Sequence, residues 1–196
     1  MRRFPLWVTI VPLMVGVGVY WHFWSGYRDA FRADIDKVLP GATIKIGGFP
    51  YRMEGEVVAP AVSGSGKIGF SASATRAIFN RGPWQRDLTV IRTIAPRARA
   101  AVDGVRGSVL DLSAVSGMSS LHLDHGRVAR QSNVFASARL TTGLLAAPIR
   151  ADKFEVHIRE LSPRSYEAWS ATPPQHVQIV LSANAARIGN GAPLTL

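Results

Sequence analysis

Residues 44–58, IKIGGFPYRMEGEVV, contain a strand-like run that stops at Gly-Gly-Phe-Pro and then resumes. The stretches 42–46 and 51–58 have the composition and length of short strands. Between them, Gly48 permits backbone angles that other residues avoid, and Pro50 fixes φ and has no N–H to donate. We therefore predict a rigid corner that leads from one strand into the next.

The side chains around this corner predict packing rather than chemistry. Phe49 is bulky enough to fill the corner from the side of the core. Arg52 and Glu54 are two residues apart, so they fall on one face of the second strand and can pair. No nucleophile or base stands at the break, and we interpret it as structural.

Beyond Gly41 the chain shows the period-two alternation of half-buried strands. In 154–159, for example, three apolar residues alternate with three polar ones. The same pattern occurs in other segments between turn residues, namely 109–115, 121–124 and 177–182. The sequence predicts a mainly β body over 41–196, built as an antiparallel, curved sheet, with one later helix at 162–169.

Three short runs of small residues end in arginine: 71–76, 136–139 and 182–187. Small residues allow sheets or backbones to approach closely. We interpret these runs as similar strand edges, with a repeat architecture as the alternative.

The N-terminal segment has the features of a membrane anchor. Residues 4–24 contain no Asp, Glu, Lys or Arg, with Trp7 near one end and Tyr20, Trp21 and Trp24 near the other. About 20 apolar residues span a bilayer core, and aromatic residues gather at its boundaries. A cleaved signal peptide is the alternative, but it needs small residues at its cleavage site. We expect residues 1–24 to form an uncleaved signal anchor that crosses the membrane once.

The charges that flank this segment predict its orientation. Arg2 and Arg3 precede it with no acid nearby, whereas residues 27–37 carry charges of both signs. The positive-inside rule then leaves the N-terminus in the cytoplasm. We expect a protein of the inner (cytoplasmic) membrane whose C-terminal body lies in the periplasm.

Residues 25–40 are predicted to form an amphipathic helix. Tyr27, Phe31, Ile35 and Val38 recur at helical spacing and make one apolar stripe, which indicates packing on the body. Pro40-Gly41 is expected to end the helix.

Composition limits the chemistry and suggests the partners. The chain has no cysteine, which excludes disulfides, zinc-thiolate sites and cysteine nucleophiles. It carries 23 Lys+Arg against 13 Asp+Glu, a formal net charge of +10. This surplus favours anionic lipid headgroups or other polyanions, with genome composition as the alternative explanation.

The order of anchor, charged helix, strand and corner resembles an alphaproteobacterial family of membrane-anchored proteins, the domain-of-unknown-function 2125 family. Its members carry a GFP[FY]R motif at this place, which here is Gly48, Phe49, Pro50, Tyr51 and Arg52. The resemblance implies a β-rich body in the cell envelope and no established activity. Members of that family run longer, so the body here is expected to be truncated relative to them. At greater distance the layout is similar to AsmA-type envelope proteins, an analogy of architecture alone.

Two motifs that suggest chemistry are better explained as turns. Residues 64–69, GSGKIG, match the glycine spacing of a dinucleotide fingerprint, but the following residues are strand-like where that fold needs a helix. His122, Asp124 and His125 are a weak metal-like cluster, because zinc needs three or four converging ligands and a partner would have to come from His157 or His176. We predict hairpin ends at both places, with no catalytic, cofactor or metal site.

These features favour a non-enzymatic envelope protein whose sheet contacts lipid or amphiphiles at the outer face of the inner membrane. The main alternative is a structural or assembly partner of another envelope protein. A hydrolase that uses His122 and Asp124, or a serine, is a further alternative. Nucleic acid is not an expected partner, since single-strand binding needs aromatic residues among the basic ones.

Overall fold

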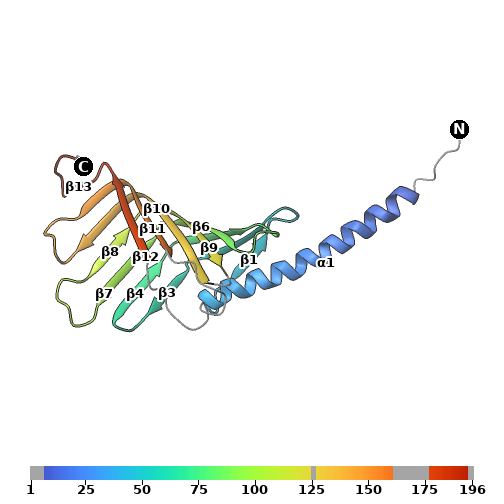
Figure 1. The fold of residues 1–196 in the computed structure, drawn as a ribbon, viewed down its shortest axis with the longest axis horizontal. Helices are drawn as coiled ribbons and strands as arrows, with labels where there is room; N and C mark the ends of the chain where they lie inside the picture. Colours follow the sequence, from blue (N-terminus) through green and yellow to red (C-terminus); the bar gives the residue numbers. More distant parts are fainter. Residues whose placement is uncertain (1–6, 125–126, 161–176, 194–196) are drawn as a thin grey trace.

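A computed structural model describes residues 7–124, 127–160 and 177–193. These residues form one long helix and a single sheet of thirteen strands (Figure 1). The free end of the helix and the C-terminal strand lie at opposite ends of the molecule's long axis.

The helix α1, Trp7–Val38, runs without interruption through the expected anchor and the expected amphipathic helix. Its described side chains from Trp7 to Val19 are all exposed. The expected stop is confirmed, because Pro40-Gly41 follows the helix and Gly41 has a φ of 75°. Within the described residues, the structure contains no helix that is long and apolar enough to cross a membrane.

The apolar stripe of the helix packs on the first strands of the sheet. Phe31 and Ile35 are buried as predicted, and Tyr27 is partly buried against them. Val38 was the wrong fourth member, since it is 57% exposed and Leu39, just past the helix end, is buried in its place. These residues form one core with side chains of the sheet: Met53, Val57, Ala77 and Phe79.

All strand pairs are antiparallel, and most neighbours in the sheet are joined as hairpins. The strands are β1 (Ile44–Gly47), β2 (Met53–Val58), β3 (Ala61–Gly64), β4 (Ile68–Ser73), β5 (Arg76–Arg81), β6 (Leu88–Ile94), β7 (Arg97–Val102), β8 (Leu110–Ser113), β9 (Ser116–Asp124), β10 (Arg127–Thr142), β11 (Ile149–Glu160), β12 (Val177–Asn184) and β13 (Arg187–Ile188).

The thirteen strands are pieces of eight passes of the chain, five of which are split into two strands by a bend. The two pieces of a pass are separated by about two residues, as between β2 and β3 or between β6 and β7. Four residues near the bends have a positive φ close to 50°: Ala59, Ala95, Ser137 and Ala185. Backbone hydrogen bonds continue across this line, for example from Ala59 N to Thr75 O at 2.9 Å. We call this line the bend line.

At the bend line, the alternation of side chains between the two faces of the sheet shifts by one residue. Val57 is buried under the helix, and Val62, five residues later, packs against the same core. In an uninterrupted strand, residues five apart point to opposite faces. The bend therefore restores apolar side chains to the side that the helix covers.

The predicted mainly β, antiparallel body is confirmed. The sheet is uncurled and has free edges, which differs from the curved sheet that we expected, because the turning is confined to single residues on the bend line. The small-residue runs at 71–76 and 182–187 lie where one strand ends at a bend and the next begins, as expected of strand edges, whereas the run at 136–139 lies at a bend inside β10. The helix expected at 162–169 lies outside the described residues.

Candidate functional site

The corner at 48–52 is structural in the way that its sequence indicates. Gly48 has a φ of 96°, and a Cβ on it would lie 2.6 Å from the carbonyl oxygen of Arg52. The Phe49-Pro50 bond is cis, and Arg52 N donates to Gly48 O at 3.0 Å. Arg52 and Glu54 form the expected ion pair at 3.1 Å. Tyr51 is 88% exposed and points away from the core.

Phe49 packs against the helix rather than into the sheet core. Its ring lies 5.8, 5.1 and 5.2 Å from the rings of Tyr20, Trp21 and Trp24, while 43% of its surface stays exposed. Trp84, from the turn after β5, adds contacts to Tyr20 and Tyr27. We call these residues the junction cluster: Tyr20, Trp21, Trp24, Tyr27, Phe49 and Trp84.

The junction cluster joins the helix to the body at a polar boundary. The Tyr20 hydroxyl donates to Pro50 O. Arg86 stacks on the Tyr27 ring at 4.4 Å, and Arg28 lies 5.9 Å from the centre of the Trp24 ring. Apolar rings with polar tips and nearby arginines are typical of a membrane–water interface.

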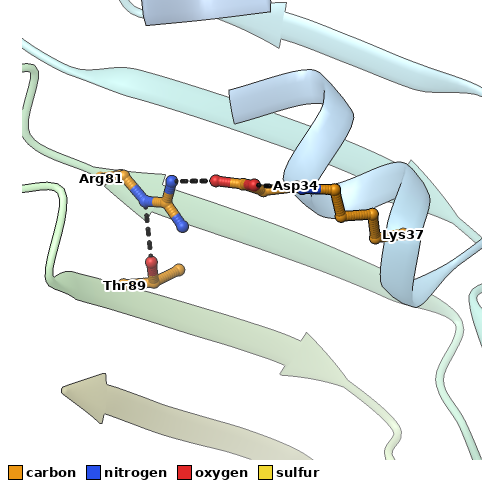
Figure 2. A network of polar contacts seen from close by, with 4 residues as sticks. All are labelled: Asp34, Lys37, Arg81 and Thr89. Carbon is orange, nitrogen blue, oxygen red and sulfur yellow. Dashed lines mark hydrogen bonds and ion pairs between the residues drawn. The ribbon is translucent and has the colours of Figure 1, made fainter. Parts of the chain in front are cut away.

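A partly buried ion pair fixes the last turns of the helix to the sheet (Figure 2). The Arg81 side chain is only 11% exposed, and its Nη1 lies 2.7 Å from Asp34 Oδ2. Its Nε donates to the hydroxyl of Thr89, a buried polar residue, at 2.9 Å. Its guanidinium also lies 5.0 Å from the centre of the Phe31 ring. These contacts join α1 to β5 and β5 to β6, so we interpret the network as structural.

The face that the helix covers, which we call the inner face, continues as an apolar surface beyond the helix. Cross-strand partners share a face. One such row begins at Gly55 under the helix and ends at the far edge strand: Gly55, Phe79, Ile91, Ser119, Asn133, Val156 and Leu181. The neighbouring row places Phe135 beside Phe154, with Phe135 against Gly117.

The inner face is open where the helix ends. Phe79 is 8% exposed beneath α1, whereas Ile179 and Leu181 on β12 are 62% and 63% exposed. Past the bend line the same face carries another apolar row: Val62, Ala72, Ala98, Leu112, Leu140, Ile149 and Ile188. The inner face is thus apolar under α1 and again on β11 and β12, with Ser119, Gln131 and Asn133 between these parts, and β12 is its most exposed strand.

The opposite, outer face is mixed between α1 and the bend line: it carries exposed apolar side chains such as Val58, Ile94 and Met118 beside several paired charges. Arg76 pairs with Glu56 at 3.1 Å. The Glu155 carboxylate pairs with the Lys153 ammonium group. It also accepts a hydrogen bond from the Ser182 hydroxyl at 3.0 Å, and its Oε2 lies 3.4 Å from His157 Nε2. These contacts, with Lys153 the largest, lower the pKa of Glu155 to about 2. This carboxylate therefore serves to join β11 and β12.

Past the bend line the outer face carries a row of arginines instead. The cross-strand row is Ala61, Ser73, Arg97, Ser113, Arg139, Arg150 and Arg187. Two shallow surface pockets of about 500 and 450 Å³ lie along it. Sequence reasoning missed this row, because its successive arginines are 11 to 42 residues apart in the chain and only the register aligns them.

The structure does not assemble the chemical motifs. Residues 64–69 form the hairpin from β3 to β4, with a strand where a dinucleotide site needs a helix, as predicted. His122 lies 3.5 Å from Asp87 Oδ2, at the end of β9, while His125 and His176 lie outside the described residues. In the part of the chain that the structure describes, no three His, Asp or Glu side chains are placed to hold a metal ion.

Comparison with known proteins gave no relative. No family model, no curated protein and no solved structure matches this chain.

Proposed function

We propose that this protein is a membrane-attached, lipid-binding protein of the cell envelope, with a binding rather than a catalytic role. Its sheet would lie at the outer face of the cytoplasmic membrane and hold acyl chains or other amphiphiles on the inner face. The observation that carries the proposal is the inner face itself. It buries apolar side chains under α1 and leaves Ile179 and Leu181 more than 60% exposed on the same side.

Acyl chains fit this face better than a protein side-chain surface does. On β11 and β12 the rows of this face from Phe154 to Ile158 consist of Leu, Ile, Val, Phe and Ala, with Gln131 and Asn133 on the neighbouring β10 and no charged residue to orient a protein partner. Interfaces between proteins are normally surrounded by a polar rim and contain direct hydrogen bonds. An unbranched chain needs only apolar contact, worth about 25 cal/mol per Å² buried.

The first half of α1 supports attachment to the membrane. It extends away from the body with apolar side chains on all sides, including Leu13 at 66% and Met14 at 68% exposed. Exposed apolar residues in one contiguous patch mark a membrane or protein contact. We propose that this half inserts into lipid and that the junction cluster, with Arg28 and Arg86, lies at the headgroup layer. The GFPYR resemblance agrees with this location and remains part of the proposal.

Substitutions on β12 test lipid binding without entering the core. Ile179→Asn with Leu181→Asn adds polar groups to the inner face, while Val180→Asn does the same between them on the outer face. Val180 is 44% exposed, so all three sites tolerate the change. The full chain is purified in a neutral detergent and its retained phospholipids are counted by native mass spectrometry.

We expect the wild type and Val180→Asn to keep lipid and the double variant to lose it. Loss of two buried aliphatic side chains weakens apolar binding by about 2 kcal/mol or more, at least tenfold. Equal retention in all three proteins, or no lipid in the wild type, would remove the proposal.

A reporter fusion tests on which side of the membrane the body lies. A phosphatase reporter that needs export, fused after Leu196, is expected to be active in cells. A reporter that works only in the cytosol would contradict the proposed side of the membrane.

Assembly with another envelope protein is the second candidate, and β12 favours it. All eight of its residues are exposed, and apolar side chains such as Val177 and Ile179 lie at its edge. An exposed, apolar edge strand can pair with a strand of another chain. Crosslinking in membranes distinguishes the two, because one dominant protein adduct at β12 and no lipid adduct supports assembly.

A further inference from the structure

The outer face beyond the bend line places arginines side by side where a stable sheet would avoid them. Arg139 is directly opposite Arg150 in the β10–β11 ladder, and Arg150 is opposite Arg187 of β13. Arg97 completes the row across Ser113 of β8. Like charges directly opposite each other destabilise a sheet. We call Arg97, Arg139, Arg150 and Arg187 the arginine row.

Acidic side chains do not neutralise the row. Among the described residues, no ion pair forms with Arg97, Arg139, Arg150 or Arg187, and Arg150 contacts only the amide oxygen of Asn190, at 3.4 Å. Arg99, one row further, is held by Asp111 at 3.8 Å, and both side chains are about half exposed. Asp152 is the acid in the pocket that Arg139, Arg150 and Arg187 line. The row therefore keeps a positive surplus.

Small hydroxyl residues form the floor between the arginines. The larger pocket is lined by Ser63, Ser71, Ser73, Ser113 and Thr141 beside Arg97 and the Arg99–Asp111 pair. Guanidinium groups bind phosphate with two parallel hydrogen bonds, and hydroxyls add further donors. Five neighbouring strands about 4.8 Å apart spread the row over roughly 19 Å, which is long enough for several phosphates.

We propose that the arginine row is a docking face for a bilayer surface rich in anionic phospholipid. Charge complementarity and the flat, extended row support a planar array of phosphates. The two pockets contain no aromatic side chain on which nucleic-acid bases could stack. They also lack the aromatic anchors that are typical of protein interfaces. The inference rests on the proposed lipid-contacting role, but it concerns the opposite face of the sheet.

The arginine row lies far from the part of α1 that we propose inserts into lipid. Its strands β7, β8 and β13 lie at the end of the molecule away from the free end of α1 (Figure 1). The row is therefore a second lipid contact, separate from the helix that inserts.

A competition between two vesicle populations tests the row. The full chain is mixed from detergent with vesicles of phosphatidylcholine alone and vesicles that also contain phosphatidylglycerol, which carry different dyes. Flotation then gives the ratio of protein on the two populations. The contribution of α1 cancels in this ratio, because both populations offer the same hydrocarbon.

The variant Arg139→Gln with Arg150→Gln is compared with Arg92→Gln and Arg130→Gln, an equal change of charge on the outer face on the other side of the bend line, where Arg130 is likewise opposite an arginine, Arg159. Each arginine near an anionic surface contributes about fivefold, so the row variant should lower the ratio by roughly twentyfold at low salt. The control variant should keep most of the preference. The row variant should unfold at the same or a higher temperature, because it removes like-charge contacts.

Several results would overturn the inference. Equal loss in both variants would mean that net charge alone acts. Loss of preference with inorganic phosphate, but not with chloride at the same ionic strength, would mean that the row holds free phosphate. Tighter binding of a DNA duplex than of anionic vesicles would indicate nucleic acid. Failure to float with neutral vesicles would instead contradict insertion of α1, and the ratio of row variant to wild type on anionic vesicles alone would still test the row.

Discussion

The corner at 48–52 depends on the backbone conformation of Gly48. Its φ of 96° lies in a region that L-residues with a side chain rarely adopt, and its missing Cβ leaves room for the Arg52 carbonyl oxygen. A Cβ on its neighbour Gly47 would have no atom within 4 Å, and the φ of Gly47 lies outside the positive region. The two adjacent glycines thus have different roles.

We expect Gly48→Ala to lower the free energy of unfolding by about 1–3 kcal/mol, because it combines a strained backbone with a backbone clash. Gly47→Ala is the control and should change it by less than about 0.5 kcal/mol. Chemical denaturation of both variants measures the difference. Equal effects would show that the corner is not held by its backbone angle.

Glu155 makes stability depend on pH in a specific direction. Its pKa falls from 4.5 to about 2 because Lys153, Ser182 and His157 hold the charged form. A lowered pKa in the folded state stabilises the protein above the unfolded value, and this contribution is lost as pH falls through 2. Unfolding curves of the wild type and Glu155→Gln should therefore converge as the pH falls from 4.5 to 2. A constant difference between them across this window would contradict the assignment.

At the scale of elements, the bend line is the feature that organises the sheet. Ala59, Ala95 and Ala185 adopt a positive φ although each has a side chain, so the bends carry backbone strain. This strain is offset because the bend places apolar side chains from both strands of a pass on the side of the sheet that the helix covers.

We expect Ala95→Val to cost about 1–3 kcal/mol, because a β-branched residue tolerates a positive φ poorly. Ala95→Gly should be neutral within about 1 kcal/mol, since relief of strain offsets the added entropy of the unfolded chain. Ala101→Val, inside β7, is the control and should be tolerated. If Val at 95 and Val at 101 have equal effects on thermal unfolding, the bends are not strained.

Much of the fold could be predicted from local patterns. The corner, the end of the helix and the antiparallel strands follow from glycine, proline and alternation. The bends could not be predicted, because a run such as 109–115 looks like one strand although β8 ends at Ser113 and β9 begins at Ser116. The arginine row was also missed, since it needs the register of five strands. Val38 and Leu39 follow Ile35 by three and four residues, so both fit helical spacing, and the sequence alone does not show that Leu39 is the buried one.

At the scale of the whole molecule, the sheet separates two chemistries. The inner face is mainly apolar and partly covered by α1, while the outer face carries most of the charged residues and becomes rich in arginine beyond the bend line. The junction cluster connects this body to the exposed half of the helix. Our proposal gives each part a lipid contact of its own: hydrocarbon for the helix and inner face, and phosphate for the outer face.

The central claim is that acyl chains lie on the inner face, and depth-sensitive fluorescence tests it most directly. The sequence has no cysteine, so single cysteines can be placed at Leu181 on the inner face and at Val180 on the outer face of the same strand. Each is labelled with a small fluorophore in the full chain, which is reconstituted with phospholipid that carries bromine in its acyl chains. We predict that bromine quenches the label at 181 and leaves the label at 180 bright. Equal quenching at both positions, or none at either, would contradict the account.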